Sequence, residues 1–497
     1  MTSVPALKAA QTSDMTMNEV EQLPAISGHE HQVVTISRGG HSKRLPHSSI
    51  DFENIRSACA IALHMHQPQI PAGGDDLPKA AIISNLQFMM DHPDIEDNHN
   101  APVFAHCYER MGEIIPKLAG EGKAPRVMLE YSGTLMHGLQ QMGRGDIIDS
   151  LRGITINPDY QPHVEWLAAP WGHAVAPSTP MQDYRLHVLA WQQHFTELFG
   201  YEALERVRGF SPSEMALPNH PDVAYEFVKT LVDCGLQWVL VQEHSVEEPG
   251  TGRNPALPHL PHRLVCRNSR GETAQIIAIV KTQGSDSKLV AQMQPWFEAQ
   301  SLNRQQLAGK SIPPLVTQIA DGENGGVMMN EFPPKYAEVV AAASHGDVPL
   351  MNVSEYLQLL FDRGIGIDAL PQLQPLFQNR IWERIQPGDG PERLQQTIES
   401  LRQEDHQFHM EGGSWTNDLS WVQGYDNVLG PMEEASALFN EVVIEPGKDT
   451  STPQYRNALY HLLCSQTSCY RYWGQGLWTD YGREICRRTT EILKHDF

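Results

Sequence analysis

The feature that most limits the fold of this chain is a regular alternation between short apolar runs and segments of helical length. The apolar runs are rich in β-branched and aliphatic residues and occupy 55–66, 126–133, 163–170, 206–214, 237–242, 274–281 and 313–326. Short strands that alternate with helices are typical of a parallel sheet covered by helices. About seven such units over roughly 290 residues predict a closed (β/α) barrel, with an open doubly wound sheet as the alternative.

The rest of the chain predicts two further regions. Residues 1–54 are polar and follow no sustained period, so we expect an N-terminal extension that is partly disordered or draped on the surface. We expect residues 55–349 to form the barrel and residues 350–497 to form a helical C-terminal domain that packs on it. Its helical patterns lie near 354–363, 391–403, 431–441 and 453–468. The Pro- and Gly-rich stretch 244–263 predicts a long mobile loop over the site.

Charge and cysteine usage exclude several classes of protein. The formal net charge is −23, and a chain this acidic lacks the basic face that nucleic acid requires. No apolar run approaches the roughly 20 residues of a membrane-spanning helix, so we expect no membrane partner. No charged-then-apolar leader opens the sequence, and the seven cysteines are scattered. We therefore expect a cytoplasmic protein with reduced thiols.

Polar side chains gather where the expected strands end. They are His64, His66, Gln67, Glu165, His173, Glu214, Asp321 and Glu323. Taken singly, a carboxylate at a strand end is usually a helix cap or a solvated charge, and a buried histidine is usually a hydrogen-bonded core residue. In a barrel, however, all the strands end at one rim, so we expect these side chains to face a common basin.

Two carboxylates from separate strands suit the cleavage of a glycosidic bond. One attacks the anomeric carbon, and the other, kept protonated by its surroundings, protonates the departing oxygen. In a retaining enzyme the two carboxyl groups lie about 5–5.5 Å apart. Histidine and glutamine side chains beside them are suited to binding sugar hydroxyls, and tryptophans to stacking on sugar faces.

Four segments carry a family resemblance. In order they read "HMHQP", "VEWLAAPWGHAVAPSTPMQDYRLHVLAWQQHFTELFG", "GFSPSEMALPN" and "IADGENGG". They resemble, in the same order, the motifs of glycoside hydrolase family 57, over about residues 58–345. The resemblance implies a seven-unit (β/α) barrel with a helical C-terminal domain. It also implies a retaining amylase or 4-α-glucanotransferase that acts on an α-glucan or malto-oligosaccharide without a cofactor or a catalytic metal.

The resemblance also implies roles for the rim residues. Glu214 corresponds to the nucleophile and Asp321 to the general acid/base, while His66 lines the subsite of the attacked sugar. The remaining substrate-binding candidates are His64, Gln67, Glu165, His173, Glu323, Trp415 and Trp473, the two tryptophans lying in "EGGSWTND" and "SCYRYWGQGLWTDYG". The chain departs from the family pattern at Ser211, where many members carry tryptophan, and after Glu323, where "NGG" replaces Phe-Gly.

Three alternatives remain open from the sequence. The His-x-His pair also suits a metal-dependent amidohydrolase or deacetylase-like barrel, in which imidazoles and a carboxylate hold the metal. A barrel that binds glucan without cleaving it fits the missing tryptophan at Ser211. Hydrolysis and transglycosylation differ in how far water reaches the intermediate, and neither that choice nor the oligomeric state follows from the sequence.

Overall fold

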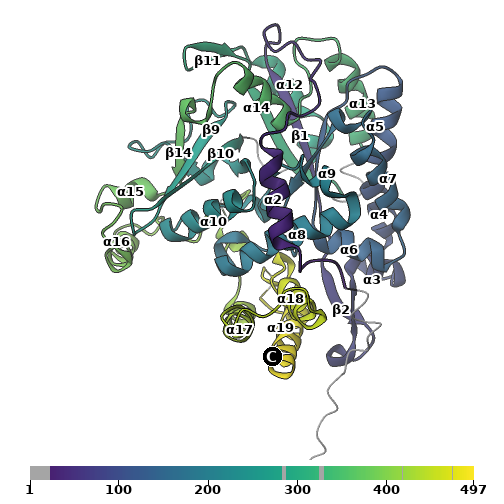
Figure 1. Cartoon of the computed structure of the whole chain (residues 1–497), viewed down its shortest axis with the longest axis vertical. Coiled ribbons are helices and arrows are strands. Elements are labelled where there is room, and N and C mark those ends of the chain that lie inside the picture. Colours follow the sequence, from purple (N-terminus) through teal and green to yellow (C-terminus); the bar gives the residue numbers. More distant parts are fainter. Residues whose placement is uncertain (1–22, 283–286, 324–329, 417, 473) are drawn as a thin grey trace, which may run out of the picture.

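The centre of the molecule is a closed barrel of parallel strands (Figure 1). A computed structural model describes residues 23–282, 287–323, 330–416, 418–472 and 474–497. Within them seven strands follow one another around the barrel, and pairing of Lys281 with Thr317 closes it. In chain order these strands are β1 (Ala58–Met65), β4 (Val127–Tyr131), β5 (Val164–Ala168), β6 (Gly209–Phe210), β7 (Trp238–Gln242), β10 (Thr273–Lys281) and β13 (Leu315–Asp321). Each strand falls in one predicted run, so the closed barrel is confirmed and the open sheet is not formed.

Side chains alternate along β1 between the outside and the inside of the barrel. Cys59, Ile61 and Leu63 belong to the large apolar core, which the strands share with the surrounding helices. Ala58, Ala60 and Ala62 belong to a second core that fills the barrel. Because successive side chains of a strand point to opposite faces, the next inward position is residue 64. The strand therefore delivers a histidine to the inner rim.

Helices cover the outside of the barrel, and α4, α5, α7 and α13 line one flank (Figure 1). The longest of the covering helices ends at Phe199, directly before Gly200 at φ +87°, as the sequence predicts. The covering helices are α4 (Ala101–Glu109), α5 (Met111–Gly120), α6 (Gly133–Gln141), α7 (Gly145–Ile156), α8 (Met181–Phe199), α10 (Pro221–Asp233), α12 (Gln294–Ser301) and α13 (Phe332–Ala343). Shorter elements between them are β2 (Gln69–Gly73), β3 (Ala81–Ser84), α3 (Asn85–Asp91), α9 (Tyr201–Leu204), α11 (Ser287–Ala291), β11 (Gln305–Leu307) and β12 (Lys310–Ile312).

The described part of the N-terminal extension, residues 23–54, packs along the barrel. It forms α2 (Glu30–Gly40), which lies against α8 and α9. Arg208 donates hydrogen bonds to the carbonyl oxygens of Gly40 and Lys43, at 3.0 and 2.5 Å. Further along, the ring of Phe52 is buried and meets that of Tyr356 edge-on at 5.3 Å. From Leu23 onward the extension is thus part of the folded unit.

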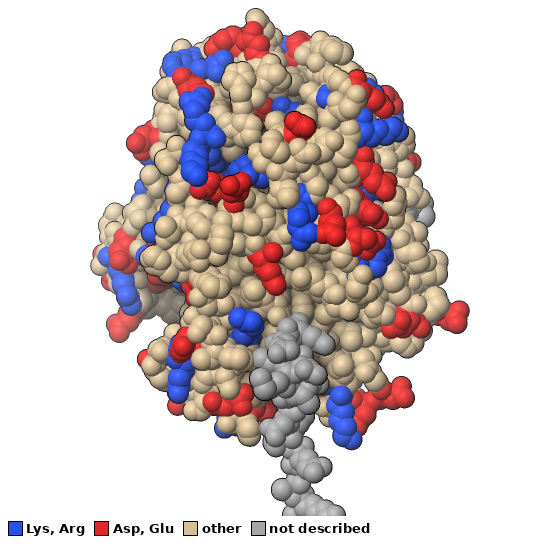
Figure 2. All heavy atoms as spheres, turned by 45° about the vertical axis from the view of Figure 1, so that its right-hand side comes forward, with Lys and Arg blue, Asp and Glu red and all other residues tan. Residues whose placement is uncertain are grey.

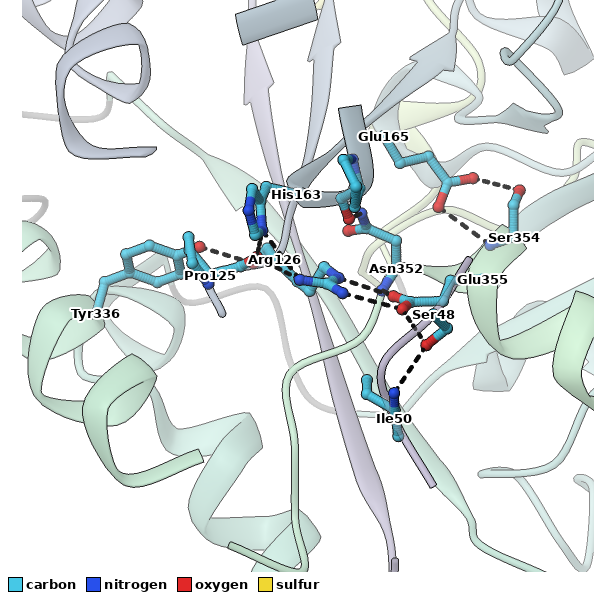
Figure 3. A network of polar contacts seen from close by, with 11 residues as sticks. Ser48, Ile50, Pro125, Arg126, His163, Glu165, Tyr336, Asn352, Ser354 and Glu355 are labelled. Atoms are coloured by element: carbon cyan, nitrogen blue, oxygen red, sulfur yellow. Dashed lines mark hydrogen bonds and ion pairs between the residues drawn. The ribbon is translucent and has the colours of Figure 1, made fainter. Parts of the chain in front are cut away.

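The helix α14 (Val353–Asp362) closes the amino end of the barrel, where its apolar side chains join the core that fills the barrel. Figure 3 shows the polar contacts of this region. Glu355 of α14 accepts two hydrogen bonds from the Arg126 guanidinium, at 2.9 and 3.0 Å, and both side chains are buried. Ser48 of the N-terminal segment donates to the same carboxylate at 2.6 Å. A fully bonded ion pair therefore joins the strand β4, the closing helix and the N-terminal segment.

The C-terminal part is mainly helical, as predicted. Its helices are α14, α15 (Gln378–Trp382), α16 (Pro391–Glu404), α17 (Asp426–Phe439), α18 (Pro453–Ser465) and α19 (Leu477–Asp496), of which α15 and α19 were not predicted from the sequence. It also adds the strand β14 (Gln372–Pro375) to the sheet, beside β9 (His262–Arg267). No helix in the described ranges combines the length and apolar character needed to cross a membrane.

The stretch 244–263 is anchored to the sheet. It contains β8 (Val246–Glu247), which pairs with β14. The buried carboxylate of Glu247 accepts hydrogen bonds from the Gln374 side chain and from the backbone N–H groups of Phe377 and Asn379, at 2.6 to 2.9 Å. This contrasts with the mobile loop expected from composition, because one buried carboxylate ties the stretch down.

Candidate active site

A charged pair stands at the carboxyl-end rim of the barrel. His64 lies directly opposite Glu130 of β4 and Asp321 of β13 in the strand registers. Its Nδ1 is hydrogen-bonded to the Glu130 carboxylate. Burial alone lowers the pKa of His64, but the charge of Glu130 and the hydrogen bond to it, with smaller effects of Asp321 and Glu323, raise it to about 10. His64 is therefore an imidazolium at neutral pH.

Two neutral histidines stack beside this pair. The rings of His66 and His173 lie 4.0 Å apart, and Nδ1 of each is bonded to a serine hydroxyl, Ser132 at 2.8 Å and Ser468 at 2.7 Å. Burial and neighbouring imidazoles hold the pKa of both histidines well below the usual value. The buried Nε2 of His173 has no hydrogen-bond partner among the described residues. It is placed to bind a ligand hydroxyl, as a neutral imidazole can either donate or accept.

Glu214 sits on a strained turn directly after β6. Its φ is +58° and that of Met215 is +52°, the left-handed region that costs a non-glycine residue about 1–3 kcal/mol. The Trp415 indole donates to the Glu214 carboxylate at 2.8 Å, and the Trp415 backbone N–H donates to the Glu214 carbonyl at 2.9 Å. These two bonds hold the carboxylate at the rim. Only one of its two oxygens is bonded to Trp415.

The charge of Asp321 acts on Glu214. Burial first, and then the negative charge of Asp321, raise the pKa of Glu214 to about 7, whereas His64 and the bond from Trp415 work in the opposite direction. Asp321 is the last residue of β13 and is exposed to solvent. One carboxyl group is thus sheltered and the other open to water, and both belong to the same rim.

Glu323 completes the cluster. One of its oxygens accepts the backbone N–H of His66 at 3.0 Å, and the other is buried without a hydrogen-bond partner among the described residues. Burial raises the pKa of Glu323 to about 8, with Asp321 adding to the shift and His64 opposing it. At neutral pH it is therefore mostly protonated and can donate a hydrogen bond.

Segments of the C-terminal part supply an aromatic side to the rim. The rings of Trp415 and Trp421 lie 4.8 Å apart, and Tyr472 follows at 4.8 Å from Trp421. All three are partly exposed. Trp473, the other tryptophan expected at the site, lies outside the described residues.

Two expected site residues are placed elsewhere. Glu165 lies at the amino end of β5, where it accepts hydrogen bonds from the backbone N–H of Ser354, at 3.1 Å, and from its hydroxyl (Figure 3). There it lines a cavity of about 40 Å³, so the structure does not bring it to the histidines. The reason is its position: it is the second residue of a strand whose carboxyl end lies at Ala168.

Gln67 follows β1, but its side-chain amide is hydrogen-bonded to neighbouring side chains. It donates to the Tyr108 hydroxyl at 3.0 Å and accepts from the Asn85 amide at 2.8 Å. It is 6% exposed, so it supports the loop behind the histidines.

The sequence reasoning missed several residues of the cluster. They are Glu130, Ser132, Trp421, Ser468, Cys469 and Tyr472, of which Cys469 brings its sulfur to 3.6 Å from Nε2 of His66. Glu130 had a usable signal, because it is a carboxylate near the carboxyl end of the buried run "RVMLEYSG". Ser468, Cys469 and Tyr472 fall in the quoted segment "SCYRYWGQGLWTDYG", but nothing within it marks them as site residues, and Ser132 had no signal at all.

In the part of the chain that the structure describes, no group of three or more His, Cys, Asp and Glu side chains is arranged to hold a metal ion. At the rim, Nδ1 of His64 is hydrogen-bonded to Glu130. Nδ1 of His66 and Nδ1 of His173 are each hydrogen-bonded to a serine hydroxyl.

Comparison with known proteins shows a shared fold. Neither a family model nor a curated protein matches the sequence. Among solved structures, a 4-α-glucanotransferase from Thermococcus litoralis superposes with a TM-score of 0.56 at 15% identity, over 89% of this chain and 60% of that one. A GH57-type branching enzyme from Pyrococcus horikoshii gives 0.53 at 11% identity, covering 88% of each chain. An α-amylase from Thermotoga maritima gives 0.51 at 10% identity, over 88% of this chain and 93% of that one.

These neighbours are glucan-active enzymes built on a similar barrel with a helical C-terminal part. Identities of 10–15% show the fold alone. The chain spans 60% of the length of the glucanotransferase. The similarity therefore establishes a shared fold and does not by itself establish a shared activity.

Proposed function

We propose that this protein is a retaining, α-glucan-active glycoside hydrolase or transglycosylase. The observation that carries the proposal is the pair Glu214 and Asp321. Glu214 lies in the turn that follows β6 and Asp321 ends β13, and the two carboxyl groups are close enough for the charge of Asp321 to raise the pKa of Glu214. A pair of this kind is what cleavage of a glycosidic bond with retention needs.

In this mechanism Glu214 is the nucleophile. Its anion attacks the anomeric carbon and forms a glycosyl–enzyme ester, and the bond from Trp415 together with the nearby His64 imidazolium stabilise that anion. The strained backbone at Glu214 keeps the carboxylate pointing to the rim, so little reorganisation is needed on attack.

Asp321 is the general acid and base. It gives a proton to the departing sugar oxygen in the first step and takes one from the incoming water or sugar hydroxyl in the second. Its exposure allows it to exchange protons with solvent between the steps. His66, His173 and Glu323 bind the sugar hydroxyls, and Trp415 offers a face for stacking.

The products formed from maltoheptaose test the function directly. We expect new malto-oligosaccharides, and proton NMR at early times should show the newly formed reducing ends as the α-anomer, because two displacements retain configuration. Shorter sugars alone mean hydrolysis, and shorter together with longer sugars mean transfer. The absence of any product, combined with measurable sugar binding, would contradict the proposal and favour a non-catalytic glucan-binding barrel.

The pH dependence of kcat/KM follows from Glu214. A raised pKa means that the carboxyl group keeps its proton up to about pH 7 in the folded protein. The nucleophilic anion is therefore lost as pH falls, and kcat/KM should drop about tenfold for each unit below that value. Initial rates with dilute maltoheptaose, checked by circular dichroism for intact folding, measure this limb. A rate that stays level down to about pH 5 would contradict the environment described for Glu214.

A further inference from the structure

A second depression lies at the amino end of the barrel, away from the rim cluster. It has a volume of about 580 Å³ and is lined by Glu53, Arg304, Lys310, Ser311, Ile312 and Arg363. Lys310 belongs to the hairpin of β11 and β12, and Arg363 directly follows α14. In Figure 1 these elements lie at the opposite end of the molecule from α17, α18 and α19.

The lining is unusual for a chain whose formal net charge is −23. It combines three cations with one carboxylate, which leaves a local charge of +2. On the face shown in Figure 2, by contrast, acidic and basic side chains lie interspersed. The one carboxylate also points outward, since the Glu53 side chain is 66% exposed against 21% for Arg304 and 23% for Arg363.

The Arg304 guanidinium is held rigidly by backbone carbonyl groups. Arg304 donates to the carbonyl oxygens of Phe52, Ile55 and Ser311, at 3.0, 2.6 and 2.5 Å. Carbonyl groups orient a cation but do not neutralise it, and the nearest Glu53 oxygen is 3.9 Å from Arg304. Such fixed donors bind an anion at little cost in side-chain entropy.

The other two cations retain hydrogen-bonding capacity. Arg363 donates through Nε to Glu53 at 2.6 Å and through Nη1 to the Leu359 carbonyl at 3.0 Å, while its guanidinium lies over the Phe52 ring. Lys310 donates to the carbonyl oxygen of Arg363, which uses one of its three N–H groups. The Ser311 hydroxyl accepts a hydrogen bond from Arg304 at 3.1 Å.

Charge and size together define the ligand. A phosphate monoester carries about −1.5 to −2 charges at neutral pH and matches the local +2, whereas a single carboxylate leaves a cation uncompensated. Arginine and lysine are the usual donors to phosphate oxygens. Pockets of about 300–1,000 Å³ take ligands of the size of a sugar phosphate. We propose that this pocket binds the phosphate group of a small phosphate monoester, at a site separate from the rim cluster.

Calorimetric titration of the full chain tests this. Inorganic phosphate and glucose 6-phosphate are the two probes, and glucose is the uncharged control. We expect saturable binding of phosphate in the millimolar range or tighter, weakening with added salt, and no binding of glucose at this pocket. Tighter binding of glucose 6-phosphate than of phosphate identifies a sugar phosphate as the ligand, and equal binding identifies free phosphate.

Variants connect the binding to this pocket. Lys310→Gln removes one exposed cation and is expected to weaken phosphate binding about tenfold, and Lys310→Glu more strongly. Lys79→Glu makes the same charge change at a side chain that is 83% exposed, and should leave phosphate binding unchanged. Arg304 is left intact because its bonds hold the backbone. The proposal is overturned if the wild-type chain shows no saturable phosphate binding, or if both Lys310 variants bind phosphate as tightly as the wild type. Because the readout is binding, it does not depend on glucan turnover.

Discussion

The Glu214→Gln variant is expected to turn over maltoheptaose at least about a thousandfold more slowly than the wild type, while its affinity for the sugar stays similar. Glutamine keeps the size of the side chain and can still accept the hydrogen bond from Trp415, seen at 2.8 Å in the wild type. It cannot attack the anomeric carbon to form the ester. Initial rates and a separate binding titration with maltoheptaose measure the two effects independently.

Glu165→Gln is the matched control. Glu165 is a buried glutamate of a barrel strand, and burial raises its pKa to about 7, as partial burial does for Glu214 in the turn after β6. It lies at the amino end of β5, bonded to Ser354. We expect the Glu165→Gln variant to keep turnover within a fewfold of the wild type. An equal loss in both variants would show that burial of a glutamate, and not nucleophilic attack by Glu214, explains the effect.

Chemical rescue adds a test that a structural role cannot imitate. In a Glu214→Ala variant, azide can occupy the vacated space and attack from the face that the carboxylate used. The product expected from an α-glucan is then a β-glycosyl azide, because only one displacement takes place. Recovery of hydrolysis without this azide product would argue against Glu214 as the nucleophile.

Removing Arg126 is expected to give the largest loss of stability. In the Arg126→Met variant the Glu355 carboxylate stays buried without its bidentate partner (Figure 3). An uncompensated buried charge of this kind lowers the free energy of unfolding by about 3–5 kcal/mol. The loss should appear as a lower midpoint in denaturant unfolding followed by tryptophan fluorescence.

Two comparisons separate the buried charge from other effects of the substitution. Arg144→Met breaks an exposed pair with Asp146 and should cost less than about 1 kcal/mol. The double variant Arg126→Met/Glu355→Met removes both charges and should regain much of the loss, because a buried ion pair is often no more stable than apolar side chains of similar volume. If Arg126→Met costs no more than Arg144→Met, the closure of the barrel does not depend on this pair.

The elements of the barrel could be predicted because their signals are local. Each strand is a short apolar run, and α8 ends where Gly200 takes a positive φ that other residues avoid. The helix α19 was missed, although it extends from Leu477 to Asp496, because its sequence is strongly charged and its apolar stripe is narrow. The anchoring of 244–263 was missed because composition says nothing of the buried bonds made by Glu247.

Within the site, position along a strand decided which of the expected side chains meet at the rim. His64 and Asp321 lie at carboxyl ends, so the common rim brings them into register. Glu165 lies in an equally apolar run, but it stands three residues before the carboxyl end of β5 at Ala168, about 10 Å along the strand, which keeps its side chain away from the rim. The bounds of a strand are the least certain part of any sequence-based assignment, and here they decided which carboxylate belongs to the site.

What the sequence determined by itself is the set of elements and the two carboxyl groups at strand ends, because apolar periodicity and chain order are written in neighbouring residues. The tertiary structure alone decided which groups surround those carboxyl groups. Glu130 meets His64 only because β4 lies beside β1, and Trp415 and Ser468 reach the rim from a part of the chain some two hundred residues or more beyond Glu214 and His173. Contacts between distant segments depend on how whole elements pack, and no local pattern of residues encodes that.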